Sequence, residues 1–323
     1  MVLSEDAAIE LHHIGLGSES PGECVDVLRS VLGFATIEES ADYTEMILGS
    51  NVARVHSKAT SVHPYACAHR TLQYLALSVA SISDLGARLQ VADIGFERAE
   101  DPEGAELLYL HPNDWCGVAL LAIPAPARQA NVLPDDANIR GIDHIGIASP
   151  DNALAQSRFA DLLGLAIESR QTDTEMWVRV EQFNSDKYGV VMVTQESVED
   201  VRGLRALFLS LSDLELEFLQ DLGMERAVAR GAGQGGATNS TAGDQNAIMR
   251  HIERFGPGMS HIAIRVRSIE DALGHAEAKG ARLIDRHGRP GSRRALIGFL
   301  HPRSTAKVLV HFVERPEGDE RGG

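Results

Sequence analysis

Five consecutive segments decide the fold of this chain: SHIAIRV (260–266), SIEDALGHAEAKG (268–280), ARLIDR (281–286), RALIGFLHPRST (294–305) and AKVLVHFVE (306–314). The first alternates apolar and polar residues and is rich in β-branched residues, which predicts a strand. In the second, Ser268 is a good N-cap, apolar residues recur at helical spacing, and Gly280 ends the helix. The other three segments predict short strands. A βαβββ unit of about 55 residues is too small to bury a core alone, so it is expected to pair with a copy of itself.

Three further copies of this unit precede it in the chain. Their first strands are predicted at Leu11–Leu16, Thr71–Val79 and Ile142–Ala148, and their helices near Cys24–Leu32, Ser83–Ala92 and Asp151–Leu163. A glycine follows each predicted helix, and the segment LLYLHPND (107–114) repeats IGFLHPRS (297–304). Because strand, helix, glycine stop and hairpin recur in one order, the chain is predicted to be an internal fourfold duplication.

The third copy is longer than the others and allows two interpretations. Extra strand-like runs lie at 175–182 and 188–194, and LRALFLSLSDLELEFLQDLG follows at 204–223. Residues 204–211 and 214–220 can form a closing hairpin, whereas the spacing of leucines at 213–222 also fits a short helix. The hairpin is favoured because RALFLSLSD is similar to RALIGFLHPRS.

Histidines in the first strands, in HIGIA (144–148) and HIAIRV (261–266), together with the fourfold repeat, make the chain resemble the vicinal oxygen chelate superfamily. That superfamily includes glyoxalase I, methylmalonyl-CoA epimerase, extradiol dioxygenases and 4-hydroxyphenylpyruvate dioxygenase. The last module looks most like methylmalonyl-CoA epimerase, and its segment GPGMSHIAIR (256–265) also looks like 4-hydroxyphenylpyruvate dioxygenase. The resemblance implies an α+β fold in which four βαβββ modules pair into two half-barrel domains.

The predicted domain boundaries follow from this repeat. An N-terminal domain spans 1–123, and a linker rich in Pro, Ala and Asp spans 124–139. The C-terminal domain, which is expected to bind metal and carry out catalysis, spans 140–315. The charged residues 316–323 are expected to form a disordered tail.

The resemblance also implies a metal site, because the family carries its ligands on first and last strands. The matching residues in the C-terminal half are His144, His261 and His311, and the family usually has Glu at the position of His311. If the hairpin interpretation holds, Glu217 is a fourth ligand or the catalytic base. The implied cofactor is one divalent metal per chain, with Fe(II) favoured over Co, Ni, Mn or Zn; imidazole suits all of these metals.

The N-terminal half is expected to lack a metal site. His13 holds the first-strand position of module one, but Tyr74 stands at that position in module two. Last-strand positions fall near Arg54, Val55, Leu120 and Leu121, none of which is a customary metal ligand.

Three residues are substrate-binding hypotheses. His301 lies in the hairpin that borders the substrate in the family, although it can equally be a turn residue. Arg294, with Arg289 and Arg293, lies in a loop that borders the acyl-CoA cleft in epimerase-like relatives, or is simply solvated. Trp177 either contacts the substrate or packs in the third module.

Composition excludes several classes of partner. A net charge of −16 and a pI near 5.2 argue against nucleic acid and anionic membranes. Three cysteines without a close pair fit a reducing compartment, and the N-terminus lacks the basic and apolar regions of a leader. We therefore expect a cytoplasmic protein that binds a small molecule, binds neither nucleic acid nor membranes, and can form a homodimer.

The functional expectation is an enzyme that chelates its substrate through adjacent oxygens. A non-haem Fe(II) dioxygenase acting on an aromatic or 2-oxo acid substrate is favoured by the tandem length and the His-rich centre. An isomerase or lyase of the epimerase or glyoxalase type, acting through a metal-stabilised enolate, is the alternative. A non-catalytic binding protein of the bleomycin-resistance type is the third, and a 5% aromatic content counts against it.

Overall fold

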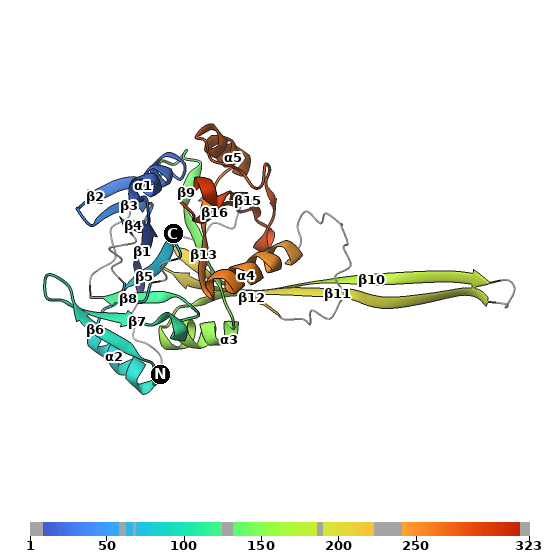
Figure 1. The fold of residues 1–323 in the computed structure, drawn as a ribbon, viewed down its shortest axis with the longest axis horizontal. Helices are drawn as coiled ribbons and strands as arrows, with labels where there is room; N and C mark the ends of the chain where they lie inside the picture. The colour runs from blue at the N-terminus through green and yellow to red at the C-terminus, as the bar shows by residue number, and fades with distance from the viewer. Residues whose placement is uncertain are drawn as a thin grey trace.

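The computed structural model describes residues 9–57, 63–66, 69–124, 132–185, 190–222 and 241–316. The described chain forms two eight-stranded mixed sheets with helices packed on them (Figure 1). The strand orders are β2-β3-β4-β1-β5-β8-β7-β6 and β10-β11-β12-β9-β13-β16-β15-β14, so the second sheet repeats the topology of the first. Among the described residues, no helix has the length and apolar character needed to cross a membrane.

The N-terminal sheet holds modules one and two. Its elements are β1 Glu10–Ser18, α1 Pro21–Ser30, β2 Ala35–Glu39, β3 Tyr43–Leu48, β4 Asn51–Ser57, β5 Leu72–Ser78, α2 Ile82–Val91, β6 Phe96–Glu100, β7 Glu106–Leu110 and β8 Ala119–Ile123. The two first strands, β1 and β5, pair antiparallel at its centre, and each pairs in parallel with the last strand of its own module. Each module therefore contributes one half of the sheet.

The C-terminal sheet holds modules three and four. Its elements are β9 Ile139–Ala148, α3 Asn152–Ala155, β10 Ile167–Ser185, β11 Val190–Leu211, β12 Leu214–Asp221, α4 Thr241–Phe255, β13 Gly258–Val266, α5 Ile269–Ala278, β14 Arg289–Pro290, β15 Leu296–Leu300 and β16 Leu309–Glu314. The hairpin interpretation of the third module is confirmed, because β11 and β12 pair antiparallel and turn between Leu211 and Leu214. Glu217 therefore lies on a strand and not on a helix.

Three local expectations were wrong. The extra strand pair of module three is not separate, because β10 and β11 continue through it as one long hairpin that projects from the body (Figure 1). The segment 281–286 forms no regular strand, and only Leu283 bridges to Leu300. The helix of module three is α-helical only over α3 and then π-helical over Gln156–Leu162.

The two halves are held together by apolar packing and by backbone contacts. One buried apolar cluster includes Leu16 and Leu75 of the first sheet and Ile145 and Ile262 of the second. Gly117, at φ +81°, lies so close to the second half that a Cβ there would be 2.0 Å from the Pro257 carbonyl oxygen. Only glycine permits this approach of two backbones.

Gly117→Ala should therefore destabilise the whole protein. A non-glycine residue at positive φ costs about 1–2 kcal/mol, and the clash with Pro257 should bring the total loss above about 2 kcal/mol. The matched control is Gly104→Ala, at φ +86° with no atom within 4 Å of the added Cβ, which should lose only about 1 kcal/mol. Urea unfolding measures both variants, and equal losses would show that the contact with Pro257 does not constrain the fold.

Candidate metal centre

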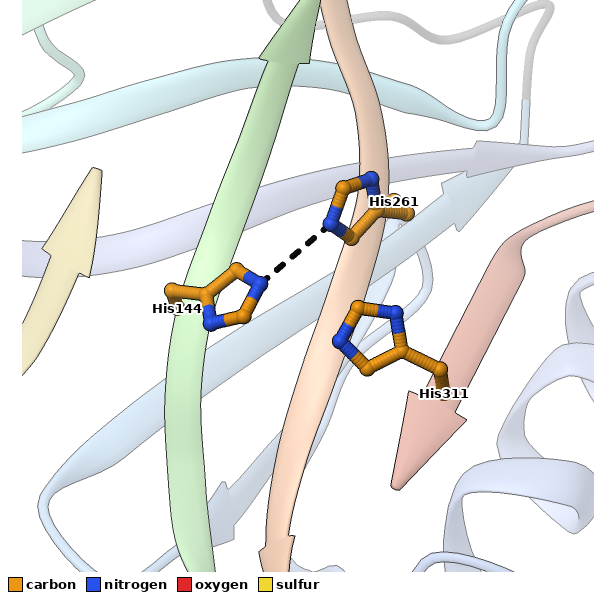
Figure 2. A group of neighbouring side chains, drawn as sticks. All are labelled: His144, His261 and His311. Carbon is orange, nitrogen blue, oxygen red and sulfur yellow. Dashed lines mark hydrogen bonds between the residues drawn. The ribbon is translucent and has the colours of Figure 1, made fainter. Parts of the chain in front are cut away.

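Four neighbouring strands of the second sheet each supply one side chain to a common point. His144 lies on β9, Glu217 on β12, His261 on β13 and His311 on β16. All four residues are buried, with at most 5% of their surface exposed. Figure 2 shows the three imidazole rings converging from their separate strands. The structure thus brings together all four residues predicted as ligands.

The strand register explains how four bulky side chains fit on adjacent strands. Gly146 stands directly between Glu217 and His261 in the sheet, and Ala263 stands between His144 and His311. A Cβ on Gly146 would lie 1.8 Å from the His261 ring, so the ring occupies the space that a side chain would fill. Small residues opposite each ligand allow the rings to lean across the neighbouring strand.

The distances among the ligand atoms of His144, His261 and Glu217 match a coordination sphere. The Nε2 atoms of His144 and His261 are 3.3 Å apart, and Glu217 Oε2 lies 3.1 Å and 3.5 Å from them. Ligands bound at about 2.1 Å in tetrahedral or octahedral geometry stand roughly 3.0–3.4 Å from one another. The three histidines each offer a nitrogen within 4.8 Å of the others.

Hydrogen bonds orient two of the rings so that their Nε2 atoms face the centre. His144 Nδ1 donates to Asp143 Oδ1 at 2.8 Å, and Arg315 donates to both oxygens of Asp143. The Ser260 hydroxyl donates to the Gly146 carbonyl, so its oxygen accepts a hydrogen bond from His261 Nδ1 at 3.0 Å. A ligating histidine usually has such a partner on its other nitrogen, because the partner sets the tautomer.

His311 supplies a further test of fit. Both of its ring nitrogens are buried, and neither has a hydrogen-bond partner within the described part of the chain. A buried imidazole without partners costs about 1–3 kcal/mol, which a coordinate bond to a cation would offset. The donor set and this unpaired ring therefore fit a divalent transition metal.

The charges of the centre also suit a cation. Burial lowers the pKa of His144, but the Glu217 carboxylate and the bonds to Asp143 and Glu217 outweigh burial and raise that pKa to about 9. Burial raises the pKa of Glu217, but His144 and His261 outweigh it and hold that pKa well below its usual range. Burial, then His261 and His144, lower the pKa of His311 far below its ordinary value. Glu217 is thus an anion and His311 a neutral base.

A cavity of about 130 Å³ opens beside the four residues. Its wall is mostly apolar and is formed by Leu204, Phe208, Leu219, Ile248, Ile297, Phe299, Leu309 and Val313, among others. Arg293, Arg315 and His251 are polar members of the wall. The sequence had suggested the loop of Arg293 as a border of the substrate cleft, but it had not indicated Arg315 or His251. Asp143, which directly precedes His144 in the chain, could have been noticed as its orienting partner.

Two of the predicted substrate-binding residues, His301 and Arg294, do not line this cavity. His301 is the N-cap of a short 3-10 helix, and its Nδ1 accepts a hydrogen bond from the Arg303 backbone, as a turn residue does. Arg294 is exposed, whereas its neighbour Arg293 points inward, donates to Glu215 at 3.0 Å and covers the Phe208 ring at 3.8 Å. The side chain of Trp177 lies outside the described residues.

The equivalent positions in the first sheet carry different chemistry. The strand pairing places Tyr74 at the position of His261, Arg54 at that of Glu217 and Leu121 at that of His311. Only His13, at the position of His144, is a residue that commonly binds metal. His13 Nε2 lies 3.1 Å from the Tyr74 hydroxyl, and Arg54 forms an ion pair with the buried Glu45. Among the described residues, the C-terminal triad is the one group of histidines, cysteines and carboxylates suited to a metal ion.

Comparison with known proteins agrees with this geometry. The model of the family described as the Glyoxalase/Bleomycin resistance protein/Dioxygenase superfamily matches residues 143–299. Residues 143–299 are thus similar to this superfamily. They contain the first strands of modules three and four with His144 and His261, so the resemblance that the sequence indicated is confirmed.

Similar proteins extend the fold to the rest of the chain. A mutant of 4-hydroxymandelate synthase from Streptomyces coelicolor is 14% identical, with a TM-score of 0.57 over 98% of this chain and 95% of that one. The Mn(II)-bound glyoxalase from Novosphingobium aromaticivorans is 13% identical, with a TM-score of 0.56 over 96% and 84%. At these identities the likeness shows the two-domain α+β superfamily fold alone. The uncharacterized protein YqjC of Bacillus subtilis (strain 168) is 25% identical over 179 residues, which are 55% of this chain and 94% of YqjC.

His311→Leu should abolish metal binding and at the same time stabilise the protein measured in a chelator. Leucine removes a ligand but also removes two buried, unpaired nitrogens, and Leu121 occupies the equivalent place in the first sheet. We expect bound metal to fall below a tenth of the wild-type amount and the free energy of unfolding in chelator to rise by about 1–2 kcal/mol. Elemental analysis and urea unfolding measure these quantities. His301→Ala, outside the cavity, is the control that should keep its metal, and a metal-replete His311→Leu protein would refute the assignment.

Metal titration should show one site per chain. The first sheet keeps only His13 among its four equivalent positions, and the described residues of that half hold no group of three His, Cys or carboxylate ligands placed for a metal ion. Equilibrium dialysis with Co(II) should give one equivalent, and His13→Ala should leave that value unchanged. A second equivalent lost on His13→Ala would contradict this expectation.

Proposed function

We propose that the protein is a metal-dependent enzyme that binds its substrate through two adjacent oxygens, and that it acts as a non-haem Fe(II) dioxygenase on a small aromatic or 2-oxo acid. The observation that carries the proposal is the centre of three histidines and Glu217 facing an apolar cavity. The superfamily match over residues 143–299 supports an enzyme of this group.

His144, His261, His311 and Glu217 would hold the ion. A divalent ion supplies a Lewis acid for substrate oxygens and, as Fe(II), a place for dioxygen. Asp143 and Ser260 would hold the His144 and His261 rings in the orientation that directs their Nε2 atoms at the ion.

The buried charges around the centre favour an anionic substrate. Glu217, Asp143 and Glu215 are buried carboxylates, and Arg293 and Arg315 are the guanidinium groups paired with the last two. The three carboxylates and two guanidinium groups have a net charge of −1, so a site that held a divalent ion would have a net charge of +1. A monoanion such as a 2-oxo carboxylate would balance this charge in a site that excludes water.

The size and character of the cavity favour a compact apolar group attached to that anion. An engineered apolar cavity of about 150 Å³ accommodates benzene, and this cavity measures about 130 Å³. The aromatic and aliphatic wall would bury a ring or a branched side chain and keep water from the reacting atoms.

Glu217 favours a second candidate function, an isomerase or lyase. Its carboxylate lies 3.1 Å from His144 Nε2 and faces the cavity, so it could instead abstract a proton from a carbon beside the substrate carbonyl. The two functions differ in the role of this single residue. As a ligand it holds the metal, and as a base it moves a proton.

Oxygen uptake distinguishes the two functions. Protein loaded anaerobically with Fe(II) should consume oxygen when given phenylpyruvate, phenylglyoxylate or catechol, and His311→Ala should abolish this. Proton exchange of an enolisable 2-oxo acid into deuterated water, without oxygen uptake, would identify the isomerase instead. In that case Glu217→Gln should retain metal and lose exchange by at least about a hundredfold, as expected on removing a general base.

A further inference from the structure

A histidine of helix α4, His251, also lines this cavity, although the helix is not one of the strands that bear the four candidate ligands. Ala247, Ile248 and His251 lie on one face of this helix, at spacings that align along a helix, and all three line the cavity. Ile248 is buried and packs with Leu204, Phe208 and Leu219 of the apolar wall. The helix face that bears His251 is therefore part of the cavity wall.

The Nε2 atom of His251 is the feature of this wall that the metal centre does not explain. It is buried, and it has no hydrogen-bond partner within the described part of the chain. Its ring also contacts Phe255 at 5.3 Å between centroids. A buried ring nitrogen without a hydrogen-bond partner destabilises the folded protein by about 1–3 kcal/mol. Because this nitrogen lies at the cavity, a polar atom of a bound ligand could supply the hydrogen bond.

The position of His251 is held from the other half of the protein. Arg70 donates hydrogen bonds of 2.6, 2.6 and 2.7 Å to the carbonyls of Phe255, Gly256 and Pro257, at the C-terminal end of α4. A cation at this end of a helix also stabilises the helix dipole. Arg70 thus anchors the C-terminal end of the helix that carries His251 to the other half of the protein.

We infer that His251 hydrogen-bonds the substrate at the metal centre through Nε2, and so selects substrates with a polar atom at that point of an otherwise apolar wall. The inference rests on the proposed function, since it takes the ligand of the cavity to be the substrate. Burial, with Arg70 nearby, lowers the pKa of His251 to about 4, which keeps the ring neutral. A neutral imidazole donates or accepts according to its tautomer.

Binding of phenylglyoxylate to the Co(II)-loaded protein tests this inference, followed through the visible absorption of the metal and by calorimetry. His251→Phe keeps a ring in the wall and removes the hydrogen bond, whereas His251→Gln keeps a polar atom that can donate or accept. We expect His251→Phe to weaken binding about tenfold or more and His251→Gln to stay within about threefold of wild type. The control is His275→Phe, the same substitution at an exposed histidine, which should not change the affinity for phenylglyoxylate.

The outcomes separate this inference from the proposed function. Both variants should retain one Co(II) per chain, because His251 is not among the metal ligands. Wild-type affinity in His251→Phe would overturn the inference and leave the proposed function standing. Loss of metal from His251→Phe would overturn it as well, since His251 would then support the centre and not the ligand. Failure of phenylglyoxylate to bind or to perturb the metal spectrum of the wild type would overturn both proposals.

Discussion

The candidate metal centre depends on the register between two antiparallel strands, β9 and β13. This register sets Gly146 opposite His261 and Ala263 opposite His144, so each ligand faces a residue too small to fill the space its ring needs. A shift by one residue would turn every ligand to the other face of the sheet. The intervening isoleucines, Ile145 and Ile262, prevent such a shift because they are buried in the apolar core on that other face.

The same register operates in the first sheet, where it supports a different interior. Gly15 stands opposite Tyr74, and a Cβ on Gly15 would lie 2.1 Å from the Tyr74 ring, just as Gly146 makes room for His261. The duplicated fold thus retained its spacing while the side chains changed. In this half Tyr74 bonds to His13 and Arg54 pairs with Glu45, so the buried polar groups at these positions satisfy one another without an ion. Arg70 of the same half holds the helix that covers the cavity of the other half.

The centre illustrates a conflict between stability and function. His311 has two unpaired buried nitrogens, and His251 has one, within the described residues. Asp143, Glu215 and Glu217 are carboxylates buried almost completely. Each of these groups destabilises a fold unless a partner compensates it. Arg293 and Arg315 compensate two of the carboxylates, and the remaining groups are those that a cation and its ligand would satisfy.

Local pattern predicted the four βαβββ modules and favoured, over a short helix, the hairpin that carries Glu217. Those features follow from alternation, glycine stops and repetition, which are properties of neighbouring residues. The convergence of His144, His261 and His311 was implied by the resemblance to the vicinal oxygen chelate superfamily. The pattern could not show that Arg293 and not Arg294 faces the cavity, because a loop has no periodicity and both residues have positive φ. It also could not show that His251 and Arg315 line the cavity, or that Arg70 of the other half bonds the end of the helix that carries His251. Only the packing of distant segments brings such residues together, and that packing is decided by the tertiary structure.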